Sequence, residues 1–205
     1  MTDIFCDALL FLKKQSNMFI IIIAILCAPG VCISADFQKG NEAALHGDYA
    51  TAHKEWEPLA EAGNPDAQLK LGMLYENGAG VKQDYLTAFK WYELSSEQGL
   101  AEAQYRLGIL YGNGKGTPKD EKAGLEMIKL AAMQGFIKAQ YAAGLAFYEG
   151  FGVKKSLIKA HAWFSVAESG GLNAARVARE TIEENMSRLE IGRAKILVLE
   201  WNRKW

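Results

Sequence analysis

Apolar residues in the middle of the chain follow the spacing of one helix face. Ala67, Leu71, Leu74 and Tyr75 stand at positions i, i+4, i+7 and i+8. This spacing places all four on one stripe of an α-helix. The pattern therefore predicts a helix over residues 65–77.

A second apolar stripe lies between Asp84 and Gly99. Its members are Ala88, Trp91, Tyr92 and Ser95. Asp84 suits the start of this helix, because its carboxylate can accept hydrogen bonds from the free N–H groups of the first turn. The equivalent positions in the other units hold Asp48, Asp120 and Ser156. Two such helices form a hairpin with one exposed apolar side, which must stack on a neighbour to be buried.

The same pattern returns every 36 residues without a gap. The recurring residues are Ala67, Ala103 and Ala139; Gly72, Gly108 and Gly144; Gly78, Gly114 and Gly150; and Gly99, Gly135 and Gly171. A fixed period of this length indicates stacked repeats. Glycine inside a helix costs about 1 kcal/mol relative to alanine. Its recurrence at position 72 therefore predicts that another backbone comes close there in every repeat.

The period divides the chain into repeats and ends. It predicts a partial repeat over 36–63, full repeats over 64–99, 100–135 and 136–171, and a capping segment over 172–205. Two helices are expected in the capping segment, over 174–184 and 187–201, with Trp201 and Trp205 sealing the last one. Atypical terminal units are common in such arrays, because they cover the open end of the stack. The predicted fold is an all-α solenoid of helical hairpins.

The first 34 residues have the order of a secretory signal. Lys13 and Lys14 precede an apolar run over 18–27, and the small residues 34–35 supply a cleavage site. This order predicts a signal peptide over 1–34 and export to the periplasm or beyond the cell. A membrane anchor is the alternative, but the apolar run is about half of the ~20 residues that a span needs. We therefore expect no membrane span in the mature chain.

Composition narrows the possible functions. A formal net charge of −1 argues against a nucleic-acid partner, which usually calls for a basic stripe. All three cysteines precede residue 35, so no disulfide or thiolate metal site is expected after it. His46, His53 and His161 lie in different elements without metal-ligand spacing and are expected at the surface or at helix interfaces. We predict no catalytic, cofactor or metal site, and no enzyme activity.

The motif resembles the Sel1-like repeat, a relative of the tetratricopeptide repeat, in its short exported bacterial form. The matching residues are Ala67, Leu71, Gly72, Tyr75, Gly78, Gly80, Val81, Ala88, Trp91, Tyr92 and Gly99. The resemblance implies a right-handed α/α superhelix that serves as an adaptor for other proteins. Some exported members are disulfide-rich and linked to binding or hydrolysis of β-lactams. This chain departs from them, because its predicted mature part has no cysteine.

The face of each first helix opposite its core stripe is the predicted binding surface, since in tetratricopeptide-like arrays it lines the concave groove. The predicted partner-binding residues are Met73, Glu76, Asn77, Tyr105, Ile109, Asn113, Tyr141, Leu145, Tyr148 and Glu149. Tyrosines among aliphatic residues suit a bound peptide or amphipathic helix. The alternative for Leu69, Tyr105 and Tyr141 is packing against the next repeat. For Lys70 and Arg106, at the edge of this face, a solvated flank is favoured over ligand contact.

These observations favour an exported, monomeric protein-interaction module that presents a preformed groove to a protein or peptide. An envelope enzyme or small-ligand binder, acting on a cell-wall fragment or a β-lactam, is the alternative. A third possibility is a structural array that joins larger complexes through its ends.

Overall fold

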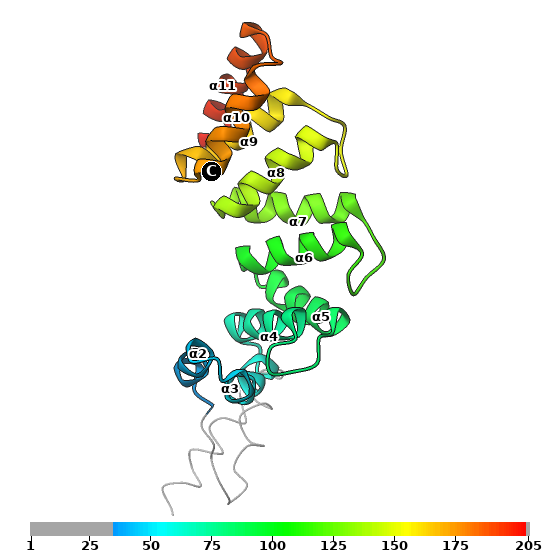
Figure 1. Ribbon diagram of the computed structural model, residues 1–205, viewed down its shortest axis with the longest axis vertical. Helices are drawn as coiled ribbons and strands as arrows, with labels where there is room; N and C mark the ends of the chain where they lie inside the picture. The colour runs from blue at the N-terminus through cyan, green and yellow to red at the C-terminus, as the bar shows by residue number, and fades with distance from the viewer. Residues whose placement is uncertain (1–34, 204–205) are drawn as a thin grey trace, which may run out of the picture. The chain divides into compact units, whose positions relative to one another are not determined.

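The computed structural model describes residues 35–203, and the regular structure in this range is entirely α-helical. Its helices, shown in Figure 1, are α2 (Phe37–Leu45), α3 (Tyr49–Glu61), α4 (Pro65–Asn77), α5 (Tyr85–Glu97), α6 (Ala101–Asn113), α7 (Glu121–Met133), α8 (Ile137–Glu149), α9 (Leu157–Ser169), α10 (Asn173–Glu183) and α11 (Arg188–Asn202). The predicted signal peptide over 1–34 and Trp205 lie outside the described residues.

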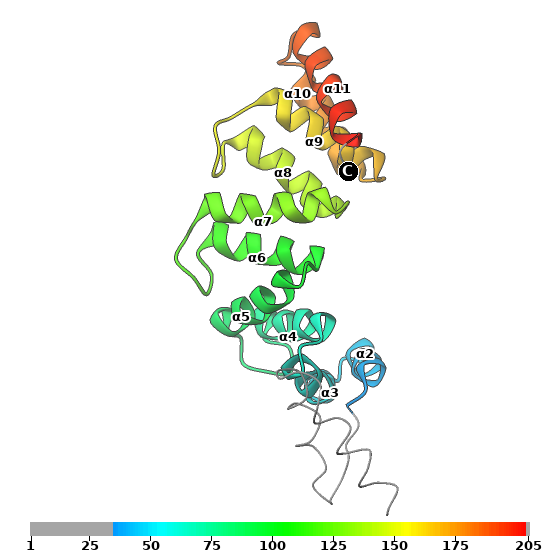
Figure 2. The same cartoon turned by 180° about the vertical axis from the view of Figure 1, so that it is seen from behind.

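The helices form antiparallel hairpins that stack in chain order. The hairpins are α2–α3, α4–α5, α6–α7 and α8–α9, and the second helix of each packs on the first helix of the next. Both views of the chain show this succession (Figures 1 and 2). At the end of the array, α10 and α11 both pack against α9. The predicted all-α solenoid is confirmed.

The predicted helix caps are present in all four second helices. The side chains of Asp48, Asp84, Asp120 and Ser156 each accept a hydrogen bond from a backbone N–H in the first turn of the helix that follows. These bonds satisfy donors that a helix start otherwise leaves open. A short polar residue, Asp or Ser, thus precedes the second helix of every hairpin.

The column formed by positions 69, 105 and 141 takes part in the packing between helices. Leu69 is only 5% exposed and joins a cluster with Ala103 and Leu107 of the next first helix. The ring of Tyr105 lies 5.4 Å from that of Phe136, and both side chains are half-buried. Tyr141 instead packs against the ring of Phe164, in the second helix of its own repeat. The alternative of packing against the next repeat is therefore what the structure shows for Leu69 and Tyr105, whereas Tyr141 packs within its own repeat.

The glycine in the middle of each first helix faces an aromatic side chain in two of the full repeats and a backbone in the third. At Gly72, an added Cβ would lie 2.5 Å from the ring of Tyr92, and at Gly144 it would lie 2.5 Å from the ring of Phe164. The expected approach of another backbone is therefore wrong for these two repeats. An aromatic side chain occupies the space instead.

The expectation is correct in the middle repeat. A Cβ on Gly108 would lie 2.7 Å from the carbonyl oxygen of Gly124. Here the second helix carries Ile128 in place of an aromatic residue, and Gly124 in place of the alanine of the other repeats. The backbones of α6 and α7 can approach closely because both contact positions lack a side chain.

A series of buried glutamines, which the apolar pattern did not predict, joins the repeats. Gln68, Gln104 and Gln140 each donate to a carbonyl oxygen of the preceding second helix, on Ala60, Ser96 and Ala132 respectively. Gln98 and Gln134 in turn donate to Gln68 and Gln104 at 2.8 Å. The available signal was the pair Ala-Gln, which recurs with the 36-residue period.

Candidate functional site

The ten predicted partner-binding residues differ in their accessibility. Asn77, Asn113, Tyr148 and Glu149 are exposed, and Tyr148 is 44% exposed. The other six are half-buried: Met73, Glu76, Tyr105, Ile109, Tyr141 and Leu145. Tyr105 and Tyr141 are engaged in the ring contacts described above, so only part of each remains available. A partner-binding role for these ten residues stays a prediction.

In the first full repeat, part of this face is occupied by the protein's own charges. The Tyr92 hydroxyl donates to Glu76 Oε2 at 2.5 Å, and Arg106 Nη1 lies 3.3 Å from the same oxygen. Arg106 also pairs with Glu102 at 2.8 Å. Burial, and then the hydrogen bond to Glu76, raise the pKa of Tyr92 far above its usual range, so the hydroxyl remains a donor. The expected solvated flank is wrong for Arg106, whose side chain is 24% exposed and paired.

Between the partial repeat and the first full repeat, smaller or shorter residues stand at the equivalent places. Gly40 lies under the ring of Trp56 as Gly72 lies under that of Tyr92, which fixes the alignment of the two hairpins. Ala44 then stands where the next repeat has Glu76, and Lys70 stands where the repeat after it has Arg106. The carboxylate that pairs with the cation in one repeat is therefore missing in the other.

A hollow of about 360 Å³ opens at this point. It is lined by Ala44, Tyr49, Trp56, Lys70, Met73, Leu74, Asn77 and Ala79. We call it the α2–α4 hollow. Two of the predicted partner-binding residues, Met73 and Asn77, line it. Lys70 makes no ion pair within residues 35–203. The structure thus brings an accessible cation and apolar walls together at the N-terminal end of the first-helix face.

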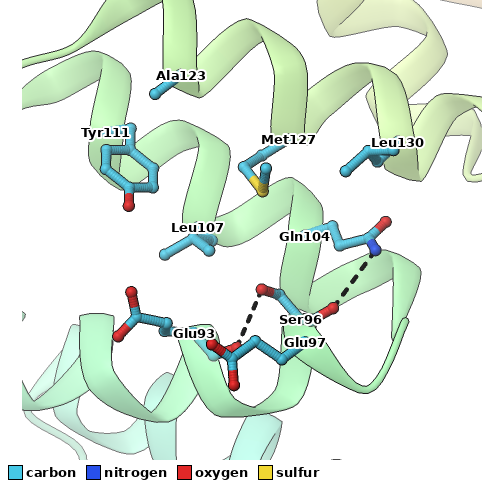
Figure 3. A pocket seen from close by; sticks show the side chains of 9 residues that line it. All are labelled: Glu93, Ser96, Glu97, Gln104, Leu107, Tyr111, Ala123, Met127 and Leu130. Atoms are coloured by element: carbon cyan, nitrogen blue, oxygen red, sulfur yellow. Dashed lines mark hydrogen bonds between the residues drawn. The ribbon is translucent and has the colours of Figure 1, made fainter.

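A second hollow, of about 350 Å³, lies between α5 and α7 with α6 as its floor (Figure 3). It is lined by Glu93, Ser96, Glu97, Gln104, Leu107, Tyr111, Ala123, Met127 and Leu130. We call it the α5–α7 hollow. By helical spacing, its α6 residues point to the other side of that helix from Tyr105 and Ile109. The recurring pattern of the sequence does not predict this site.

The structure also brings together a serine, a histidine and a carboxylate. Glu183 Oε1 lies 2.6 Å from Nε2 of His161, and Ser165 Oγ lies 3.3 Å from Nδ1. These are the residue types of a hydrolase triad. Here, however, the Ser165 hydroxyl donates to the carbonyl of His161 at 2.9 Å, and His161 is only 1% exposed. A substrate has no access to this ring, and the cluster joins α9 to α10.

Arg179 completes that cluster from α10. It donates to Glu183 at 2.6 Å and to Glu168 at 2.7 Å. Burial would raise the pKa of Glu183, but hydrogen bonds from His161 and Arg179 outweigh it and hold this pKa below its usual value. Glu183 therefore stays ionised as the partner of both groups, in a structural role. His161 lies at a helix interface, as expected from the sequence.

Residues 35–203 contain neither a cluster of metal ligands nor a helix that could span a membrane. No group of three or more metal-ligating side chains occurs there. No helix in this range has both the length and the apolar character needed to cross a bilayer.

The hairpins, their caps and their glycine pattern match a known repeat. A family model described as "Sel1 repeat" matches residues 65–100, 101–136 and 137–172, which together make up more than half of the chain. The chain belongs to the Sel1 repeat family. Proteins of this family are generally scaffolds for protein interactions, and their fold is typically non-enzymatic. Each match of the Sel1 repeat begins one residue after the border predicted from the period.

Two solved structures are similar to this Sel1 repeat protein. A Sel1 repeat protein from Oxalobacter formigenes superposes with a TM-score of 0.67 at 31% identity, over 72% of this chain and 60% of the other. A protective antigen present in uropathogenic Escherichia coli strains, displaying an SLR fold, gives a TM-score of 0.48 at 28% identity, over 82% of this chain and 45% of the other. This chain therefore spans less than two thirds of each relative. No curated protein matches it.

Proposed function

We propose that this Sel1 repeat protein is an exported interaction module that holds a segment of another protein on its first-helix face, without chemistry of its own. The observation that carries the proposal is the α2–α4 hollow. It joins Met73 and Asn77 to an accessible cation, Lys70. Pockets with apolar walls and a few polar groups are the usual form of a specific site.

The neighbouring repeat indicates which chemistry suits this hollow. There, the Glu76 carboxylate lies against Arg106. In the hollow, the cation is retained as Lys70, while Ala44 leaves the place of the carboxylate open. An acidic side chain from a partner fits that place, and its aliphatic stem would contact Trp56 and Met73. The proposed ligand is therefore an acidic protein segment.

Exposed residues further along the same face can extend the contact. Asn113, Tyr148 and Glu149 are exposed on the first helices of the following repeats. A segment that begins in the α2–α4 hollow and follows this face would meet them in order. Most of the binding energy is expected at the hollow, because well-packed pockets usually dominate an interface.

Site-specific photo-crosslinking in cells tests this proposal. A photoreactive residue at position 77, at the rim of the hollow, is expected to give a defined protein adduct. Position 195 on α11 is a suitable control, because Lys195 is exposed and far along the chain from the hollow. Adducts of equal yield from both positions would show only random encounters, and would overturn the proposal.

Export is supported by the order of residues in 1–34 alone, with Lys13 and Lys14 before the apolar run. Cell fractionation followed by N-terminal sequencing is the direct measurement. We expect an exported protein that begins at Ala35 or Asp36. A protein that keeps residues 1–34 and stays with the cytosolic fraction would contradict export and leave the groove proposal to be tested separately.

A further inference from the structure

The α5–α7 hollow exists because one position of the repeat carries a smaller side chain in the middle repeat than in the other two. The second helices carry Trp91, Met127 and Trp163 at equivalent places, 36 residues apart. Trp91 packs against the core formed by α3 and α4, and Trp163 is only 3% exposed in the core formed with α7 and α8. Each indole thus fills the space between two second helices. Met127 has no ring, and the corresponding space between α5 and α7 remains open.

The floor and one wall of the α5–α7 hollow are mainly apolar. Leu107 and Tyr111 of α6 form the floor, and Met127 and Leu130 of α7 form one wall (Figure 3). Leu130 is 44% exposed, although it is a large hydrophobic residue. Exposed apolar surface that is hollowed and bordered by polar residues is typical of an interaction site.

The opposite wall is acidic. Glu93 and Glu97 stand one helical turn apart on α5, and neither carboxylate makes an ion pair within the part of the chain that the structure describes. Like charges at this spacing weaken a helix. A cation brought by a partner would offset this repulsion. The hollow therefore combines a space that an indole fills elsewhere in the array with an uncompensated negative rim.

We propose that the α5–α7 hollow binds a protein segment that carries a tryptophan next to arginine or lysine. The partner's indole takes the place that Trp91 and Trp163 fill in the other repeats. Its basic side chain pairs with Glu93 and Glu97. Tryptophan and arginine are the residues most often dominant at protein interfaces. This site differs from the α2–α4 hollow in its face and in its charge, so one chain can join an acidic partner to a basic one.

The test uses the purified full chain and a fluorescent peptide, acetyl-Gly-Arg-Trp-Arg-Gly-amide, in a fluorescence anisotropy titration. Met127→Trp fills the hollow from within and is expected to weaken peptide binding at least tenfold, with an unchanged or raised melting temperature. Replacing the peptide's tryptophan by alanine is expected to weaken binding to the same degree. Binding that is unaffected by Met127→Trp, or absent in the unaltered chain at millimolar peptide, would overturn the proposal.

A matched pair of variants separates the hollow from general surface charge. Glu93→Gln combined with Glu97→Gln is expected to weaken binding at least tenfold. Glu57 and Glu61 form the equivalent pair on α3, beside a space already filled by Trp91. Glu57→Gln combined with Glu61→Gln is therefore expected to leave binding unchanged. An equal loss of peptide affinity in this control would show that binding depends on surface charge alone, and would overturn the proposal.

Analytical ultracentrifugation distinguishes a foreign partner from a second copy of the chain. We expect a monomer at all concentrations for the unaltered chain and for Met127→Trp. A dimer that is lost in Met127→Trp would assign the hollow to self-association and overturn the proposal of a foreign partner.

Discussion

Replacing Gly108 by leucine is expected to lower the free energy of unfolding by about 3 kcal/mol or more. Overpacking a core contact typically costs about 1–3 kcal/mol, and more where the neighbour cannot move. Here the neighbour is backbone: even a single Cβ would lie 2.7 Å from the carbonyl oxygen of Gly124. The helices α6 and α7 would have to separate in the middle of the array. Chemical denaturation followed by circular dichroism measures the loss.

Two alanine variants provide the control for this prediction. Gly192 on α11 has nothing within 4 Å of an added Cβ. Gly192→Ala is therefore expected to raise stability, by up to about 1 kcal/mol from helix propensity. Gly108→Ala makes the same chemical change and is expected to lower stability. An unchanged or raised stability for both Gly108 variants would show that α6 and α7 do not approach as closely as described.

The second large effect is expected for Trp163→Ala, which should cost about 3–5 kcal/mol, as is usual for removing a buried tryptophan. Trp163 is only 3% exposed, and its ring lies 4.5 Å from that of Trp201 on α11. The variant would open the last hairpin and remove the surface on which α11 packs. Hydrogen exchange is expected to show lost protection in α9 and α11 before α4 and α5.

Met127→Ala is the matched control, since Met127 stands at the equivalent place but beside an open hollow. The loss there is expected to be clearly smaller than for Trp163→Ala, because fewer packing atoms are removed from a half-buried site. Equal losses for the two variants would contradict the account of Trp163 as the residue that fills its inter-helix space.

The sequence predicted the fold well because the features that define each repeat depend on residues that are close together in the chain. The stripe of Ala67, Leu71 and Leu74 predicted a helix over 65–77, and α4 has these bounds. Asp84 and its equivalents predicted the starts of the second helices, since capping depends on residues that are close in the chain. The predicted seal at Trp201 also agrees with its contact with Trp163.

The sites were harder to predict, because they depend on differences between repeats. The 36-residue pattern draws attention to what recurs, whereas both hollows arise where one repeat carries a smaller side chain than a neighbouring repeat. The period alone places Met127 between two tryptophans, but the open space beside it is known only from the stacked helices. The position of Ala44 opposite Lys70 likewise requires the structure, because the partial repeat has a shorter turn. The pairing of Arg106 with Glu76, 30 residues away, likewise requires the stacked helices.

The most direct test of the central claim, that the first-helix face holds an acidic partner segment, is photo-crosslinking from position 77 in cells that carry Ala44→Glu. This variant supplies the missing carboxylate from within, where it can pair with Lys70 as Glu76 pairs with Arg106. Ala174→Glu on α10 is the control, because it adds the same charge at an exposed site. We predict that Ala44→Glu lowers the yield of the adduct at least tenfold at an unchanged melting temperature, and that Ala174→Glu does not. An adduct of undiminished yield in Ala44→Glu would show that the hollow does not hold the partner.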